Sequence, residues 1–319
     1  MSEEGSLRTS LSKPRPFLGP PRVLAPRKEG HVSATVQFIV PGLAASAGER
    51  ERLVSLFDRL DVGVQAAAIE RVANEATGQT GILASATFYV PAKSPDEAEA
   101  TIDTASALVV ERFLGVLSFL AGVRCVAINA QTTRTGEGAT YSTTLEPSSR
   151  SGQAPATLRW APGAFGDDTP PAHVFNALLW LRRGLAARDP LATYGALMNS
   201  LQATAQLLVD SGPAQEPCPH CGRPPARETV DTDGVRELVV QRIGAPTELF
   251  DRIWEARNAA LARDGASVTA DTLRRLTELK LDAATLCYKG IKLALGMPLD
   301  GPPQLDASQF ITSTLMDVH

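Results

Sequence analysis

A helix predicted over residues 247 to 264 carries a charged side chain on its apolar stripe. The stripe consists of large residues at spacings of four and seven, namely Phe250, Trp254 and Leu261. Arg257 falls between the last two. A guanidinium stays protonated, so it needs a carboxylate, carbonyl groups or a phosphate as its partner. The pattern predicts that Arg257 faces the rest of the protein or a subunit interface. The alternative is an arginine at the edge of the stripe whose head group reaches water.

A second group of side chains has the chemistry of a metal site. Cys218 and Cys221 are separated by two residues, with His220 between them and Gly222 after them, which makes half of a zinc knuckle. Three interpretations stay open. Two such loops could share one zinc ion across a two-fold axis, the thiols could remain reduced without metal, or they could form a redox disulfide. We expect no disulfide-linked partner.

The elements that must position these groups differ between the two halves of the chain. The first half is predicted to be mixed α+β, with strands at 32–40 and 82–90, a hairpin of 123–130 with 139–146, and helices at 49–60 and 95–121. The second half is predicted to be helical, at 170–187, 190–210, 235–243, 247–264 and after the capping residue Thr269. Four long helices with short connections indicate an antiparallel four-helix bundle.

The same patterns predict domain boundaries. We expect a disordered tail rich in proline and arginine over 1–30, an α+β domain over 31–150 and a linker over 151–171. A helical bundle over 172–298 follows, with the cysteine-containing insert at 212–226, and then a tail over 299–319.

Composition excludes several classes of protein. The formal net charge of −4 gives no overall positive field, so any nucleic-acid contact must be local. Four cysteines are too few for a disulfide scaffold, which favours the reducing cytoplasm. The most apolar run, Phe113 to Val123, has about half of the length that a bilayer requires, so no membrane span is expected.

The residues around Ser46 weakly resemble the nucleophile elbow of hydrolases. The first glycine of that motif is replaced by Ala44.

Two stretches of the second half resemble HEPN domains. The first runs from Trp254 through Arg257-Asn258 to Arg263-Asp264-Gly265, and the second is the end of the last helix, from Lys289 to Gly296. The order of elements is most similar to the methylamine-utilisation J-type and related defence-associated HEPN proteins. The resemblance spans residues 80 to 296 and implies a homodimer.

The resemblance also implies a site. In active HEPN members, the arginine and a histidine of two subunits meet and cleave RNA without metal. Arg257 and Asn258 match that motif, but the permitted histidine positions hold Ala262, Arg263 and Asp264. An aspartate that is ionised near neutral pH cannot donate the proton that the histidine supplies. The match therefore implies weak or absent ribonuclease activity on a retained binding surface.

From these observations we expect a non-catalytic protein that contacts RNA or acts as a scaffold. Arg257 and Arg263 would hold phosphates, and Asn258 would orient the ligand. One alternative is an accessory protein of an amine-oxidation pathway, methylamine utilisation, as the resemblance implies. The other is a metal-independent ribonuclease with an unorthodox base such as Asp264.

Overall fold

The structure, a computed structural model, describes the chain in segments that belong to two compact units. These segments are residues 31–60, 62–73, 80–91, 94–134, 140–143, 156–160, 165, 172–187, 189–208, 232–261 and 269–308. The first unit comprises residues up to Phe113 together with Val126–Leu158, and the second comprises Leu114–Cys125 together with the chain from Arg159 onward. The division assigns 114–125 to the helical unit, although the sequence placed that segment in the first domain.

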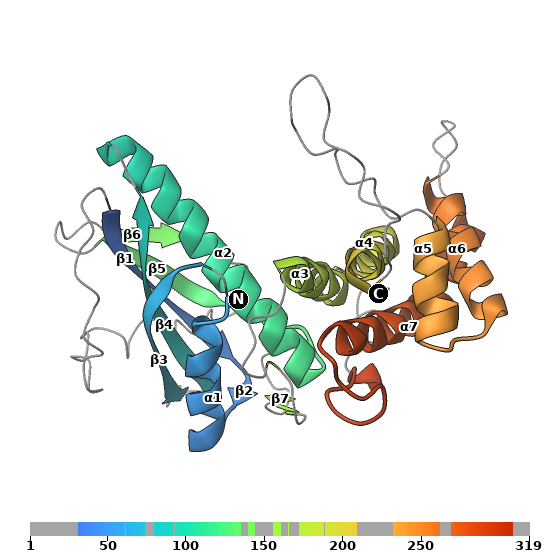
Figure 1. The fold of residues 1–319 in the computed structure, drawn as a ribbon, viewed down its shortest axis with the longest axis horizontal. Coiled ribbons are helices and arrows are strands. Elements are labelled where there is room, and N and C mark those ends of the chain that lie inside the picture. Colours follow the sequence, from blue (N-terminus) through green and yellow to red (C-terminus); the bar gives the residue numbers. More distant parts are fainter. Residues whose placement is uncertain are drawn as a thin grey trace, which may run out of the picture. The chain divides into compact units, whose positions relative to one another are not determined.

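The first unit is built on an antiparallel sheet (Figure 1). Its strands are β1 (His31–Pro41), β3 (Val64–Ala73), β4 (Thr80–Pro91), β5 (Ile128–Arg134) and β6 (Thr140–Thr143), in the order β3-β4-β1-β5-β6. The short strands β2 (Leu43–Ala44) and β7 (Ala156–Thr157) pair in parallel. The predicted mixed α+β class is confirmed, and β5 and β6 pair as antiparallel strands, although β5 begins at Ile128 and not at residue 123 as predicted. Strand β3 was not predicted, because its alanine-rich sequence lacks a clear alternation.

Two helices pack on one face of this sheet. They are α1 (Ala47–Phe57) and the first part of α2 (Pro95–Ala121). Phe113 of α2 stacks on Phe57 of α1 with ring centroids 4.4 Å apart, and meets Phe38 of β1 edge-on at 5.7 Å. Every second residue of β1 from Ala34 to Val40 is almost fully buried, as expected for a strand with one covered face.

Helix α2 contains a long apolar segment. Its segment Glu97–Ala121 is long and apolar enough to cross a membrane by length and composition, a wider segment than the Phe113–Val123 run considered above. However, 72% of its most apolar window is buried inside the protein, which fits the core helix of a folded protein equally well.

The second unit is helical. Its elements are α3 (Ala172–Ala186), α4 (Pro190–Leu208), α5 (Thr232–Arg236), the π-helix η2 (Glu237–Arg242), α6 (Thr247–Leu261) and α7 (Ala270–Ala294) (Figure 1). Helix α4 packs against α3 and α7, and α6 packs against α7. The predicted cap of α7 is confirmed, since the Thr269 hydroxyl accepts from the Thr272 N–H at 3.2 Å. In α7, the residues Leu276, Leu279, Ala283, Leu286 and Gly290 recur at spacings of three and four and are buried, which gives the helix one apolar face.

The first residues of the predicted tail, 299–306, make hydrogen bonds to the helical unit. Lys292 is 2% exposed, and its ammonium donates to the carbonyl groups of Leu299 and Gly301. Farther along, the Asp306 N–H donates to the Gly122 carbonyl at 2.8 Å. Burial lowers the pKa of Lys292, so these carbonyl bonds are what compensate its desolvation. A segment without helical or strand periodicity gives no sequence signal for such packing.

Other predicted segments lie outside the described residues. These are the tail 1–30, most of the linker 151–171 and the insert 212–226.

Candidate functional site

Helix α6 faces the helical unit through residues three apart. Phe250, Ile253 and Ala256 are all at most 5% exposed, and the Tyr194 hydroxyl donates to the Ile253 carbonyl at 2.8 Å. The predicted stripe through Trp254 was therefore displaced by about one residue. Trp254 and Arg257 are half-buried at the edge of the packed face. Within a single chain, Arg257 therefore matches the alternative interpretation, an arginine at the edge of the apolar stripe.

The Arg257 side chain ends a continuous stack of rings and guanidinium groups. Its guanidinium lies 4.5 Å from the ring centroid of Trp254, which stacks on Phe250 at 5.6 Å and 19°. Arg236, the last residue of α5, lies over the other member of that ring pair, with its guanidinium 5.9 Å from the Phe250 centroid. We call these four residues the aromatic–arginine stack.

The stack holds a charge in place without neutralising it. Arg257 donates from Nη1 to the Asn258 side-chain oxygen at 3.3 Å, and no carboxylate in the described part of the chain pairs with it. Each exposed cation–π contact contributes about 0.5–1 kcal/mol, enough to favour one orientation of the guanidinium. The arrangement therefore presents a planar, positively charged group beside an amide.

The other predicted binding residues cannot be placed. Arg263 and Asp264 lie outside the described residues, as do Cys218, His220 and Cys221 of the predicted zinc site. Elsewhere, within the described segments, there is no group of three or more His, Cys, Asp or Glu side chains that could hold a metal ion. The zinc site stays a prediction.

A groove between α6 and α7 was missed by the sequence analysis. It encloses about 340 Å³ and is lined by Arg252, Glu255, Ala256, Ala259, Asp271, Thr272, Arg274, Arg275, Glu278 and Leu279. The signal that could have revealed the groove is the spacing of Asp271 with Arg274 and Arg275, three and four residues later on one helix face.

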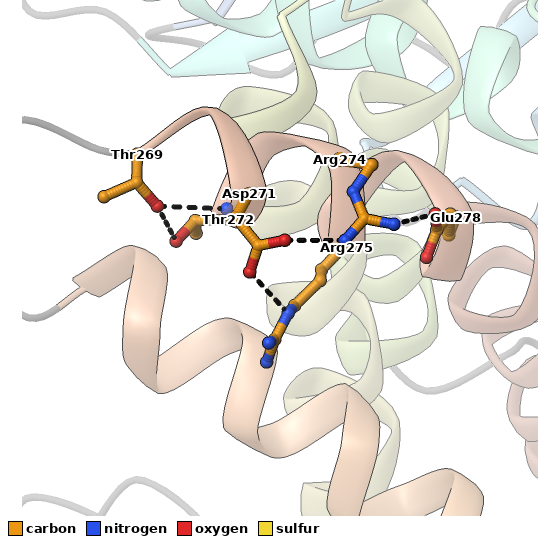
Figure 2. Close-up of polar contacts among 6 residues, drawn as sticks. All are labelled: Thr269, Asp271, Thr272, Arg274, Arg275 and Glu278. Carbon is orange, nitrogen blue, oxygen red and sulfur yellow. Dashed lines mark hydrogen bonds and ion pairs between the residues drawn. The ribbon is translucent and has the colours of Figure 1, made fainter.

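Ion pairs organise the α7 side of this groove (Figure 2). Asp271 accepts from Arg274 Nη2 at 2.6 Å and from Arg275 Nε at 2.9 Å, and Arg274 Nη1 also donates to Glu278 at 3.2 Å. The hydrogen bond from Arg274 is the main reason that the pKa of Asp271 is lowered. All four side chains are more than half exposed, so these pairs orient one another and add little stability.

No family model, curated protein or solved structure matches the chain. The HEPN resemblance therefore stays a prediction.

Proposed function

We propose that α6 contacts single-stranded RNA without cleaving it. The observation that carries the proposal is the Arg257 guanidinium held over the Trp254 ring, with Asn258 beside it. Unpaired bases stack on aromatic rings and guanidinium planes, and a guanidinium also donates to phosphate oxygens. An edge position, half-buried and without a carboxylate partner among the described residues, leaves such contacts open to a ligand.

The proposal includes a HEPN-like four-helix bundle of α3, α4, α6 and α7 that pairs with a second copy. It is supported by the helix order, the three-residue connection between α3 and α4, and the buried apolar face of α7. The HEPN histidine is replaced at the permitted positions, Ala262 to Asp264, so the proposal assigns binding and no catalysis.

Salt dependence tests whether the contact is local. With a net charge of −4, the protein can neutralise few phosphates. Each neutralised phosphate of a single strand contributes about 0.7 to the slope of log Kd against log salt, so we expect a slope of about 1 to 2. A labelled single-stranded RNA of about ten nucleotides, within the range that one binding module covers, is suitable for fluorescence anisotropy.

Variants of Arg257 distinguish the contribution of the planar guanidinium group to RNA binding from that of its positive charge. We expect Arg257→Ala to weaken RNA binding about tenfold or more, because both stacking and a phosphate contact are lost. Arg257→Lys keeps the charge but loses the plane, and should restore only part of the affinity. The matched control is Arg183→Ala on α3, which removes one charge from a similar pair, with Arg183 4.9 Å from the Trp180 ring. Equal losses of RNA affinity in Arg257→Ala and Arg183→Ala would contradict the proposal. The absence of RNA binding by the wild-type protein would also contradict it.

A cleavage assay in chelator separates binding from catalysis. We expect labelled RNA to remain intact with the wild-type protein. Cleavage that disappears in Arg257→Ala would instead support the ribonuclease alternative with an unorthodox base such as Asp264.

A further inference from the structure

The α6/α7 groove presents charged groups that no other described side chain satisfies. Arg252 and Glu255 lie three residues apart on α6 and form no ion pair in the part of the chain that the structure describes. Across the groove, Arg275 uses Nε for Asp271 and points toward α6 (Figure 2). Its two Nη groups have no acceptor among the residues described.

The remaining carboxylates of the groove are already engaged. Asp271 accepts from both Arg274 and Arg275, and Glu278 accepts from Arg274. The open donors are therefore the guanidinium of Arg252 and the outer N–H groups of Arg275. Glu255 is the open acceptor.

The formal charges of the side chains that line the groove indicate which class of ligand it can bind. Three arginines, Arg252, Arg274 and Arg275, face three acids, Glu255, Asp271 and Glu278, so the lining sums to zero. A simple anion would meet as many negative as positive groups. A ligand that carries one charge of each sign can satisfy the two open guanidinium groups and the open carboxylate together.

The floor of the groove suits a small apolar group. Its lining includes the buried Ala256 and Leu279, which are 5% and 4% exposed, and Ala259, whose short side chain is exposed. Residues three apart on a helix have Cβ atoms about 5–6 Å apart, so Arg252 and Glu255 can reach the two ends of one compact zwitterion.

We propose that this groove binds a free α-amino acid with an apolar side chain. The carboxylate lies between Arg252 and Arg275, the ammonium group meets Glu255, and the side chain lies over Ala256 and Ala259. This site is separate from the aromatic–arginine stack and does not depend on the RNA proposal.

Three probes that share the leucine side chain test the two charges separately. Leucine carries both charges, N-acetyl-leucine lacks the cation and leucinamide lacks the anion. Chemical-shift titrations of the full-length protein by NMR should give a Kd of about 1 mM for leucine, because the site is open to solvent. Each derivative should bind about tenfold more weakly, since each loses one charge-assisted contact.

Variants assign the charges to residues. Arg252→Gln should weaken leucine binding about tenfold and reduce the preference for leucine over leucinamide, since Arg275 still contacts the carboxylate. Glu255→Gln should remove the preference for leucine over N-acetyl-leucine. The control is Arg242→Gln, since Arg242 pairs with Glu237 on η2 and does not line the groove. The control should bind like the wild type.

Two results would overturn the proposal. One is the absence of any saturable shift with leucine. The other is binding of inorganic phosphate or N-acetyl-leucine as tightly as leucine, which would indicate a general anion site.

Discussion

At the residue scale, burial controls the ionisation of Cys287. Its side chain is fully buried in α7, and Sγ donates to the Leu197 carbonyl at 3.2 Å. Burial raises the pKa of this thiol from 9.0 to about 12. Tyr194 and Tyr288 are also buried, and burial raises the pKa of both phenols. In the folded protein these groups stay neutral well into alkaline solution.

This predicts a loss of stability as the pH rises. Above pH 9 the thiol ionises in the unfolded chain but stays protonated in the folded one, so the free energy of unfolding falls until the folded pKa is reached. One such group contributes up to about 1.4 kcal/mol per pH unit. Cys287→Ser keeps the donor and the approximate size but removes the ionisation. Urea unfolding at about pH 8 and about pH 10 should show a smaller decrease for the variant. An identical decrease would mean that the thiol does not contribute.

At the element scale, a serine that resembles a nucleophile serves as a helix cap. The Ser46 hydroxyl accepts from the Glu49 N–H at 3.3 Å, and the Glu49 carboxylate accepts from the Ser46 N–H at 2.7 Å. This reciprocal pair is a capping box, which satisfies two N–H groups at the start of α1. The hydroxyl therefore has a structural partner.

Removing this cap should destabilise the first unit. We expect Ser46→Ala to lower the free energy of unfolding by about 1 kcal/mol. Ser55→Ala is the matched control, because the Ser55 hydroxyl is exposed in the same helix and bonds only locally, to the Arg52 carbonyl at 2.8 Å. The control should change stability by less than about 0.5 kcal/mol. Chemical denaturation of both variants gives the comparison, and equal losses would argue against a capping role.

At the scale of the whole molecule, Gly122 connects distant parts of the helical unit. It ends α2 with a φ of 72°, where an L side chain is strained, and its carbonyl accepts from the Asp306 N–H. A Cβ added there would collide with the Gln304 carbonyl oxygen. The chain thus approaches itself across more than half of its length at a position that only glycine fits.

A pair of glycine variants tests this close approach. Gly122→Ala should lower the free energy of unfolding by at least about 2 kcal/mol, from backbone strain and the clash together. Gly195→Ala in α4 should instead raise it by about 0.5–1 kcal/mol, since nothing lies within 4 Å of the added methyl group and alanine favours the helix. Thermal unfolding monitored by circular dichroism measures both. A neutral Gly122→Ala would contradict the packing of residues 304–306 on α2.

The sequence by itself determined the elements whose apolar residues repeat strongly. The strand β1, the helix α2 with its apolar run, and the helix α7 with its Thr269 cap were predicted correctly. These signals are local, because a helix or strand with one buried face must show its own period.

Only the tertiary structure decided which neighbour each face meets. On α6, Ile253 and Trp254 are both apolar, and packing against the helical unit buries the first and leaves Trp254 at the edge with Arg257. Strand β3 is defined by its pairing with β4, and the position of residues 299–301 by the carbonyl groups that Leu299 and Gly301 offer to Lys292. The α6/α7 groove likewise exists only because two helices bring their charged sides together. Such contacts join residues far apart in the chain, so no local period reports them.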